Sequence, residues 1–119
     1  MKYSAHHLLF YRKRFNKGYA HRLRKAFVYE IPDDMHTALH KIVGPAPAIS
    51  EEEAMRMYVE YKRLDQDLDL YEALNWLILN APSAEFAMAI MAQLGFIRNY
   101  EATHHDWWTD RFTYALGAY

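Results

Sequence analysis

The sequence predicts an α+β protein that is mostly helical, in which an N-terminal β-hairpin and a helix precede a small bundle of three or four helices. Its 119 residues are enough for one domain. Apolar residues make up 52% of the chain and aromatic residues 16%, a composition that supports a packed core and argues against disorder. Strand-favouring segments precede residue 33, and helical spacing of apolar residues follows it. We therefore expect a β-hairpin–helix unit over residues 1–45 and a helical portion, packed on it, over residues 46–119.

The N-terminal unit reads as a strand, a long turn, a second strand and a helix. The apolar and aromatic run HHLLFYRKRF favours a first strand that starts at residue 6. Asn16 and Gly18 are turn signals, and the segment YAHRLRK after them could hold a helical turn. The segment AFVYEIP, residues 26–32, favours the second strand, which Pro32 ends.

A helix is expected to follow over residues 33–43. Asp33 and Asp34 suit its start, because carboxylates stabilise the positive end of a helix dipole. Gly44 and Pro45 end it. Apolar residues recur on one side of it at helical spacing: Met35, Leu39, Ile42 and Val43.

Three further helices are expected after a short connector at residues 44–50. Ser50 and Glu53 form a capping box that opens the first, over residues 51–66. Pro82 and Ser83 separate the second, over residues 67–81, from the third, over residues 84–102. A short final helix is expected within residues 106–119. The second helix has a broad apolar face: Leu70, Ala73, Leu74, Leu77 and Ile78.

The chain has no cysteine, which excludes disulfides and thiolate metal sites. Any metal ion would therefore need imidazole, carboxylate or water ligands. No apolar run reaches the length of a membrane span, and the N-terminus lacks the apolar core of a signal peptide. These features predict a soluble cytoplasmic protein with no membrane partner.

Four histidines form the most informative pattern in the sequence. His36 and His40 are four residues apart on the expected helix, so their side chains share one face and can converge on one ion. The adjacent pair His6 and His7 lies on the hairpin, which could pack in front of that helix. Imidazole is a good ligand for zinc and similar divalent metals. The alternative is that the helix histidines face solvent or pack on the hairpin and bind nothing.

A histidine pair on a hairpin, followed by a helix with the pattern HxxxH, resembles the ββα-metal motif of HNH nucleases, especially the colicin-type DNases. The resemblance covers about residues 6–43. It implies that His6, His36 and His40 hold a single divalent metal, Zn or Mg, and that His7 is the general base. The family has an asparagine separated from the first helix histidine by eight residues, and this chain has Phe27 at that place. That difference puts catalysis, more than the fold or metal binding, in question.

The segment between the two histidine pairs is strongly basic. Residues 1–29 carry eight Lys or Arg and no acid, so the remaining six Lys or Arg and all 15 Asp or Glu lie in residues 30–119. Such a segment can neutralise phosphates while its aromatic residues stack on bases. The alternatives are a solvated surface, or two halves of opposite charge that neutralise each other. The predicted nucleic-acid contacts are Arg12, Lys13, Arg14, Lys17, Arg22, Arg24 and Lys25.

These patterns lead to an HNH-like protein of phage or mobile-element type that engages nucleic acid and hydrolyses phosphodiesters. The rival hypothesis is a catalytically inactive module that binds or inhibits a protein complex, for example a phage anti-CRISPR-type inhibitor, and a third is a structural subunit. A second histidine pair, His104 and His105, lies close to Asp106 and Asp110 but matches no known motif. Trp107 and Trp108 are expected to anchor the C-terminal segment.

Overall fold

The computed structural model describes residues 2–12 and 14–104. Two strands and five helices make up this part of the chain, which confirms the prediction of a mostly helical α+β protein with an N-terminal hairpin. The final helix expected within residues 106–119 lies outside the described residues. In chain order the elements are β1 (Tyr3–His7), α1 (Gly18–Ala26), β2 (Val28–Pro32), α2 (Asp33–Ile42), α3 (Glu51–Arg63), α4 (Leu70–Leu79) and α5 (Ala84–Thr103).

Strands β1 and β2 form a two-stranded antiparallel sheet in which His6 lies opposite Tyr29 and His7 opposite Val28. The first strand therefore starts three residues earlier than predicted and ends at His7. The chain leaves the sheet there because Leu8 and Leu9, consecutive residues, are both fully buried. A strand that alternates its side chains between two faces of a small sheet does not bury both.

The connection between the strands contains α1, a nine-residue helix where the sequence indicated only a helical turn. Lys17 at its N-cap offers no side-chain hydrogen bond. The carboxylate of Glu51, from α3, accepts a hydrogen bond of 2.9 Å from the Tyr19 N–H instead. Gly18 has φ +84°, and a Cβ atom there would lie 2.7 Å from Glu51 Oε2. Glycine is thus required at the point where α3 caps α1.

Helix α2 is tied to the first strand at its N-terminus. The Ser4 hydroxyl donates to the Asp33 carboxylate, and the Asp33 N–H donates to the Lys2 carbonyl at 3.0 Å. Met35 and Leu39 are fully buried, as their spacing predicts. Ile42, predicted on the same side, is 73% exposed, because it is the last residue of the helix and Val43 takes the buried place after it.

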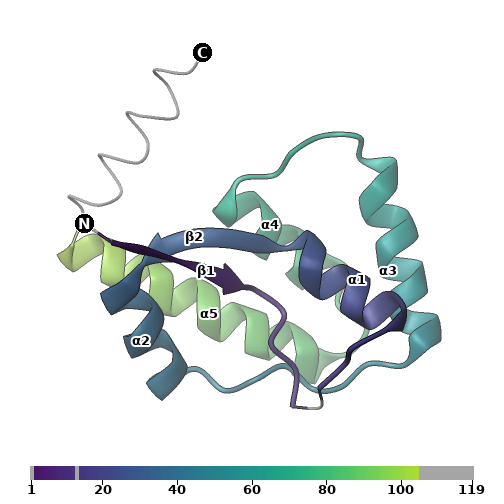
Figure 1. Ribbon diagram of the computed structural model, residues 1–119, viewed down its shortest axis with the longest axis horizontal. Helices are drawn as coiled ribbons and strands as arrows, with labels where there is room; N and C mark the ends of the chain where they lie inside the picture. Colours follow the sequence, from purple (N-terminus) through teal and green to yellow (C-terminus); the bar gives the residue numbers. More distant parts are fainter. Residues whose placement is uncertain (1, 13, 105–119) are drawn as a thin grey trace.

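Helices α3 and α5 begin where the sequence indicates, whereas α4 begins at Leu70, three residues later than predicted. The capping box of Ser50 and Glu53 opens α3, and a second one, Asp69 with Glu72, opens α4. Figure 1 shows the strands crossing over α5, with α2 at one end of this layer and α1 beside α3 at the other. Buried residues from Leu8 to Ile97 form one core cluster that joins the hairpin–helix unit to the helical portion. None of the described helices is long and apolar enough to cross a membrane.

Candidate metal centre and basic groove

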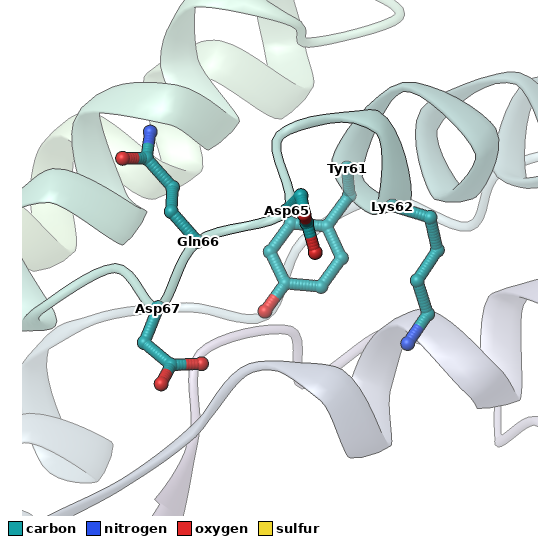
Figure 2. A pocket seen from close by; sticks show the side chains of 5 residues that line it. All are labelled: Tyr61, Lys62, Asp65, Gln66 and Asp67. Atoms are coloured by element: carbon teal, nitrogen blue, oxygen red, sulfur yellow. The ribbon is translucent and has the colours of Figure 1, made fainter.

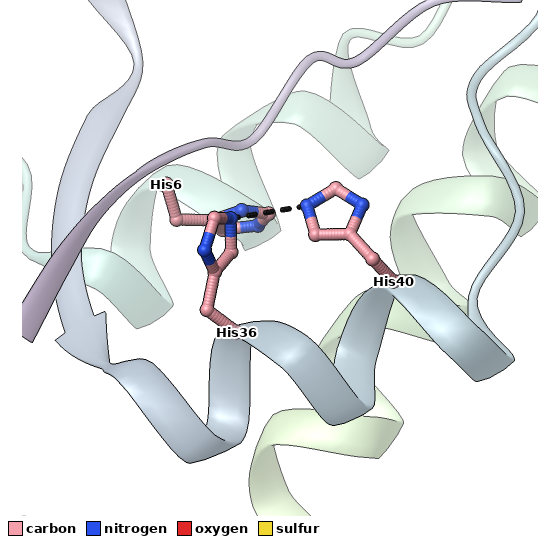
Figure 3. Close-up of side chains that lie close together, drawn as sticks. All are labelled: His6, His36 and His40. Atoms are coloured by element: carbon pink, nitrogen blue, oxygen red, sulfur yellow. Dashed lines mark hydrogen bonds between the residues drawn. The ribbon is translucent and has the colours of Figure 1, made fainter.

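The three predicted metal ligands converge in the structure. His6 comes from β1, whereas His36 and His40 lie one turn apart on α2 (Figure 3). One ring nitrogen of each lies within 4.8 Å of the others. The Nε2 atoms of His36 and His40 are 3.1 Å apart. We call this arrangement the histidine triangle.

The spacing within the triangle suits a tetrahedral metal ion. Nitrogen ligands about 2.0–2.1 Å from zinc at tetrahedral angles lie roughly 3.3 Å from one another. The Nε2–Nε2 distance between His36 and His40 is close to this value. His6 completes the set from the other side, and three histidines leave a fourth position for water or a substrate oxygen.

Gln93 of α5 fixes which nitrogen of His6 is available. Its amide Nε2 donates to the Leu8 carbonyl at 2.7 Å, so its Oε1 faces His6 Nε2, 2.8 Å away. That oxygen can only accept, and His6 must therefore carry its hydrogen on Nε2. The lone pair of the neutral ring is then on Nδ1, which is buried and has no hydrogen-bond partner among the described residues. A metal ion would satisfy this atom, and a second-shell hydrogen bond of this kind commonly orients a histidine ligand.

The electrostatics of the triangle favour the neutral forms of His6 and His40. Burial lowers the pKa of His6 to about 4, and repulsion from His36 and His40 adds to this effect, while the hydrogen bond with Gln93 opposes it. Burial and then His36 lower the pKa of His40. Because only a neutral imidazole can ligate a metal, the site is prepared for a cation at neutral pH.

His7, the predicted general base, lies next to the triangle but is not part of it. Consecutive strand residues point to opposite faces, and His7 is half-buried whereas His6 is fully buried. Burial, then Arg24 and His36 lower the pKa of His7. The imidazole of His7 is therefore near enough to both residues to feel their charge.

Phe27, at the position of the family's asparagine, is a core residue. Its ring is fully buried and contacts Tyr61 and Trp76, with centroid distances of 4.5 and 5.8 Å. It offers no side-chain hydrogen bond to the histidine pair. Its carbonyl, however, accepts a hydrogen bond of 2.9 Å from the Leu8 N–H, so its main chain holds the segment that follows His7.

A concave surface with a volume of about 390 Å³, the basic groove, lies beside the triangle. Arg12, Arg14 and Arg24, three of the predicted nucleic-acid contacts, line it. The groove and the triangle share one wall, because the Phe10 ring lines the groove and also packs on His40 with a centroid distance of 4.6 Å. The other residues that line it are Tyr11, Phe15, Asn16 and His21.

Of the other predicted contacts, those that the structure describes are not in the groove. Arg22 lies over the Tyr19 ring, 5.0 Å from its centroid, and Tyr19 in turn contacts Tyr58 of α3. Lys17 and Lys25 are exposed and do not line the groove. Lys13 lies outside the described residues. Helix α1 therefore presents Arg24 to the groove and turns Arg22 toward α3.

Two residues of the site had not been identified from the sequence. Gln93 could have been found as a polar residue at a core register of α5, one turn after Ile90 and one turn before Ile97. Phe10 gave no such signal, because its contact with His40 depends on the path of the chain after β1. Of the second histidine pair, only His104 is described; it stacks on Tyr100 with a centroid distance of 4.0 Å. His105, Asp106 and Asp110 lie outside the described residues.

Comparisons of the chain with protein-family models, curated proteins and solved structures found no match. The resemblance to the ββα-metal motif therefore rests on the histidine pattern itself.

Proposed function

We propose that this protein binds one divalent metal ion through His6 Nδ1, His36 and His40, and that it hydrolyses phosphodiester bonds of nucleic acid. The observation that carries the proposal is the histidine triangle, in which ligands from β1 and α2 meet beside a groove lined by three arginines. The bound ion would act as a Lewis acid on a phosphate oxygen.

The remaining chemistry falls to residues beside the triangle. A neutral His7 can accept a proton from the attacking water, and its lowered pKa keeps it neutral at pH 7. Arg24, which also lines the groove, would hold the phosphate next to His7. The main-chain hydrogen bond between Leu8 and Phe27 would replace part of what the family's asparagine does for the base.

The first experiment measures metal content by mass spectrometry on untagged protein and the melting temperature with and without chelator. Wild type is expected to carry one metal ion and to have a lower melting temperature in the presence of chelator. His36→Ala/His40→Ala is expected to lose both properties. His21→Ala/His104→Ala removes two imidazoles elsewhere and is expected to keep both. A wild-type protein without metal, and with a melting temperature indifferent to chelator, contradicts the proposal.

Catalysis is tested separately with His7→Ala in a plasmid-nicking assay. This variant is expected to keep its metal and fold but to nick about 10²–10⁴-fold more slowly, the usual contribution of a general base. Nicking that is unchanged in His7→Ala would remove His7 from the mechanism. It would not affect the metal-binding part of the proposal.

A second candidate function is a catalytically inactive protein that binds a protein partner through an acidic surface. The loop between α3 and α4 favours it, because Asp65 and Asp67 line a concave surface there with Tyr61, Lys62 and Gln66 (Figure 2). This loop lies at the opposite edge of the molecule from the basic segment before α1 (Figure 1). Charge reversal, Asp65→Lys/Asp67→Lys, should abolish such binding, whereas metal binding and nicking should remain.

A further inference from the structure

The basic groove and the histidine triangle are adjacent because of the chain that follows β1. Main-chain hydrogen bonds hold this segment against the 44–50 connector: the Ala46 N–H donates to the Phe10 carbonyl at 2.8 Å, and the Arg12 N–H donates to the Ala46 carbonyl at 2.9 Å. The Phe10 ring is therefore held between the groove and His40. Only the Phe10 ring would therefore separate a molecule in the groove from the metal ligand His40.

The groove combines the two kinds of group that bind an unpaired nucleotide. The guanidinium groups of Arg14 and Arg24 can neutralise and hold phosphates, whereas Arg12 is paired with Glu85. Its aromatic wall, in which the Tyr11 hydroxyl donates to the Ala20 carbonyl at 3.2 Å, offers rings to a base. Its volume falls in the range of small-ligand pockets, whereas a duplex would meet only its rim.

One residue that lines the groove has a buried nitrogen without a hydrogen-bond partner in the part of the chain that the structure describes. His21 of α1 lines the groove, and its Nδ1 is buried without a hydrogen bond to any described residue. An unsatisfied buried nitrogen is unusual, because it costs free energy unless a ligand or water supplies the missing contact. A group that enters the groove would have to displace the atoms that cover this nitrogen before it could supply that contact.

We propose that the groove binds one nucleotide of a single-stranded nucleic acid, with its base against Phe10 and its phosphates on Arg14 and Arg24. The neighbouring phosphate would then reach the histidine triangle. A base in a duplex is paired and stacked, so it would have to leave the helix to enter this space. This inference rests on the proposed function for the identity of the substrate, but the binding itself needs no metal.

The test measures the fluorescence anisotropy of a labelled oligothymidylate of about a dozen nucleotides, in EDTA, over a series of salt concentrations. A labelled hairpin duplex of the same charge is the comparison. Wild type is expected to bind the single strand at least about tenfold more tightly than the duplex. Each phosphate contact contributes roughly −0.7 to the slope of log K against log salt for single strands. Arg14→Ala/Arg24→Ala should therefore flatten that slope by about 1.4.

The matched control is Arg22→Ala/Lys25→Ala, which removes the same charge from parts of α1 that do not line the groove. It should keep the wild-type slope within experimental error. Phe10→Leu keeps an apolar core contact but removes the aromatic face, and should weaken single-strand binding at least about fivefold. Equal slopes for the two double variants, or equal affinity for strand and duplex, would overturn the inference.

The inference and the proposed function fail separately in these experiments. If wild type carries no metal but binds single strands through Arg14 and Arg24, the groove stands and the hydrolase proposal falls. If the metal and His7-dependent nicking are present but groove variants bind as wild type does, the inference alone is wrong.

Discussion

The histidine triangle and the basic groove share one wall but are built in opposite ways. The triangle draws on β1, α2 and α5, its His6 is fully buried, and Gln93, which orients it, is only 2% exposed. The groove is formed by an irregular segment and one face of α1, and two of its arginines, Arg12 and Arg14, are exposed. Packing fixes the geometry of the first region, whereas the second mainly supplies charge.

This difference determines how each region should respond to change. The buried imidazole of His6 is coupled to the folding equilibrium, so the triangle affects stability and pH dependence. Exposed arginines contribute little to folding but act on polyanions over a distance that salt controls. A substitution in the triangle should thus change stability or metal affinity, and one in the groove should change nucleic-acid binding.

The largest expected effect is on acid stability in the absence of metal. The pKa of His6 is about 4 in the folded protein and ordinarily 6.5, so the unfolded chain binds more protons between these values. Stability in chelator should therefore fall as pH decreases from 6.5 to 4, by up to about 3 kcal/mol from His6, with His7 and His40 acting in the same direction. Urea unfolding at pH 7 and pH 4.5 measures this.

Two variants test whether this loss of stability at low pH comes from the histidines of the triangle. His6→Gln keeps an N–H donor for Gln93 but cannot be protonated, and should lose most of the pH dependence that wild type shows in this range. Arg14→Ala, in the groove, should keep the wild-type dependence. If the stability of His6→Gln decreases with pH as steeply as that of wild type, the titrating groups lie outside the triangle. The proposed difference between the triangle and the groove would then be wrong.

The next largest effect is expected from Gln93, which supports the triangle without touching the metal. Gln93→Leu removes the acceptor for His6 Nε2 and the donor to the Leu8 carbonyl. Metal affinity, measured by competition with a chelating dye, should fall about 10–100-fold, as is usual when a second-shell partner is lost. Gln93→Glu keeps an acceptor for His6 but loses the donor to the Leu8 carbonyl, so it should lose less affinity than Gln93→Leu does. Equal losses in both variants would show that the acceptor for His6 does not set the metal affinity.

Local patterns in the sequence account for most of the fold and for the three histidines of the triangle. The apolar spacing of α2, the capping box of Ser50 and the HxxxH pattern each lie within a few residues, so they can be read without knowing the tertiary structure. The hydrogen bond of His6 with Gln93 joins residues 87 positions apart, and it depends on how α5 passes beneath the sheet. The nine-residue α1 likewise depends on a cap from Glu51 in another helix.

The smallest expected effect comes from the rim of the groove, where Arg12 is paired with Glu85 of α5. Both side chains are more than half exposed, so the pair should contribute little to stability. Glu85→Gln would release Arg12 for a phosphate and remove a charge that repels the strand. We expect single-strand affinity in EDTA to rise by less than about fivefold and the salt slope to steepen by up to about 0.7.

Glu52→Gln makes the same change of charge in the first turn of α3, outside the groove, and controls for net charge. If it tightens binding as much as Glu85→Gln does, the strand responds to the charge of the whole protein and not to Arg12. If only Glu85→Gln acts, a single exposed ion pair sets how much of the groove's charge is available to a strand. The groove could then be adjusted without altering the triangle, since Arg12 and Glu85 pair with each other and not with its histidines.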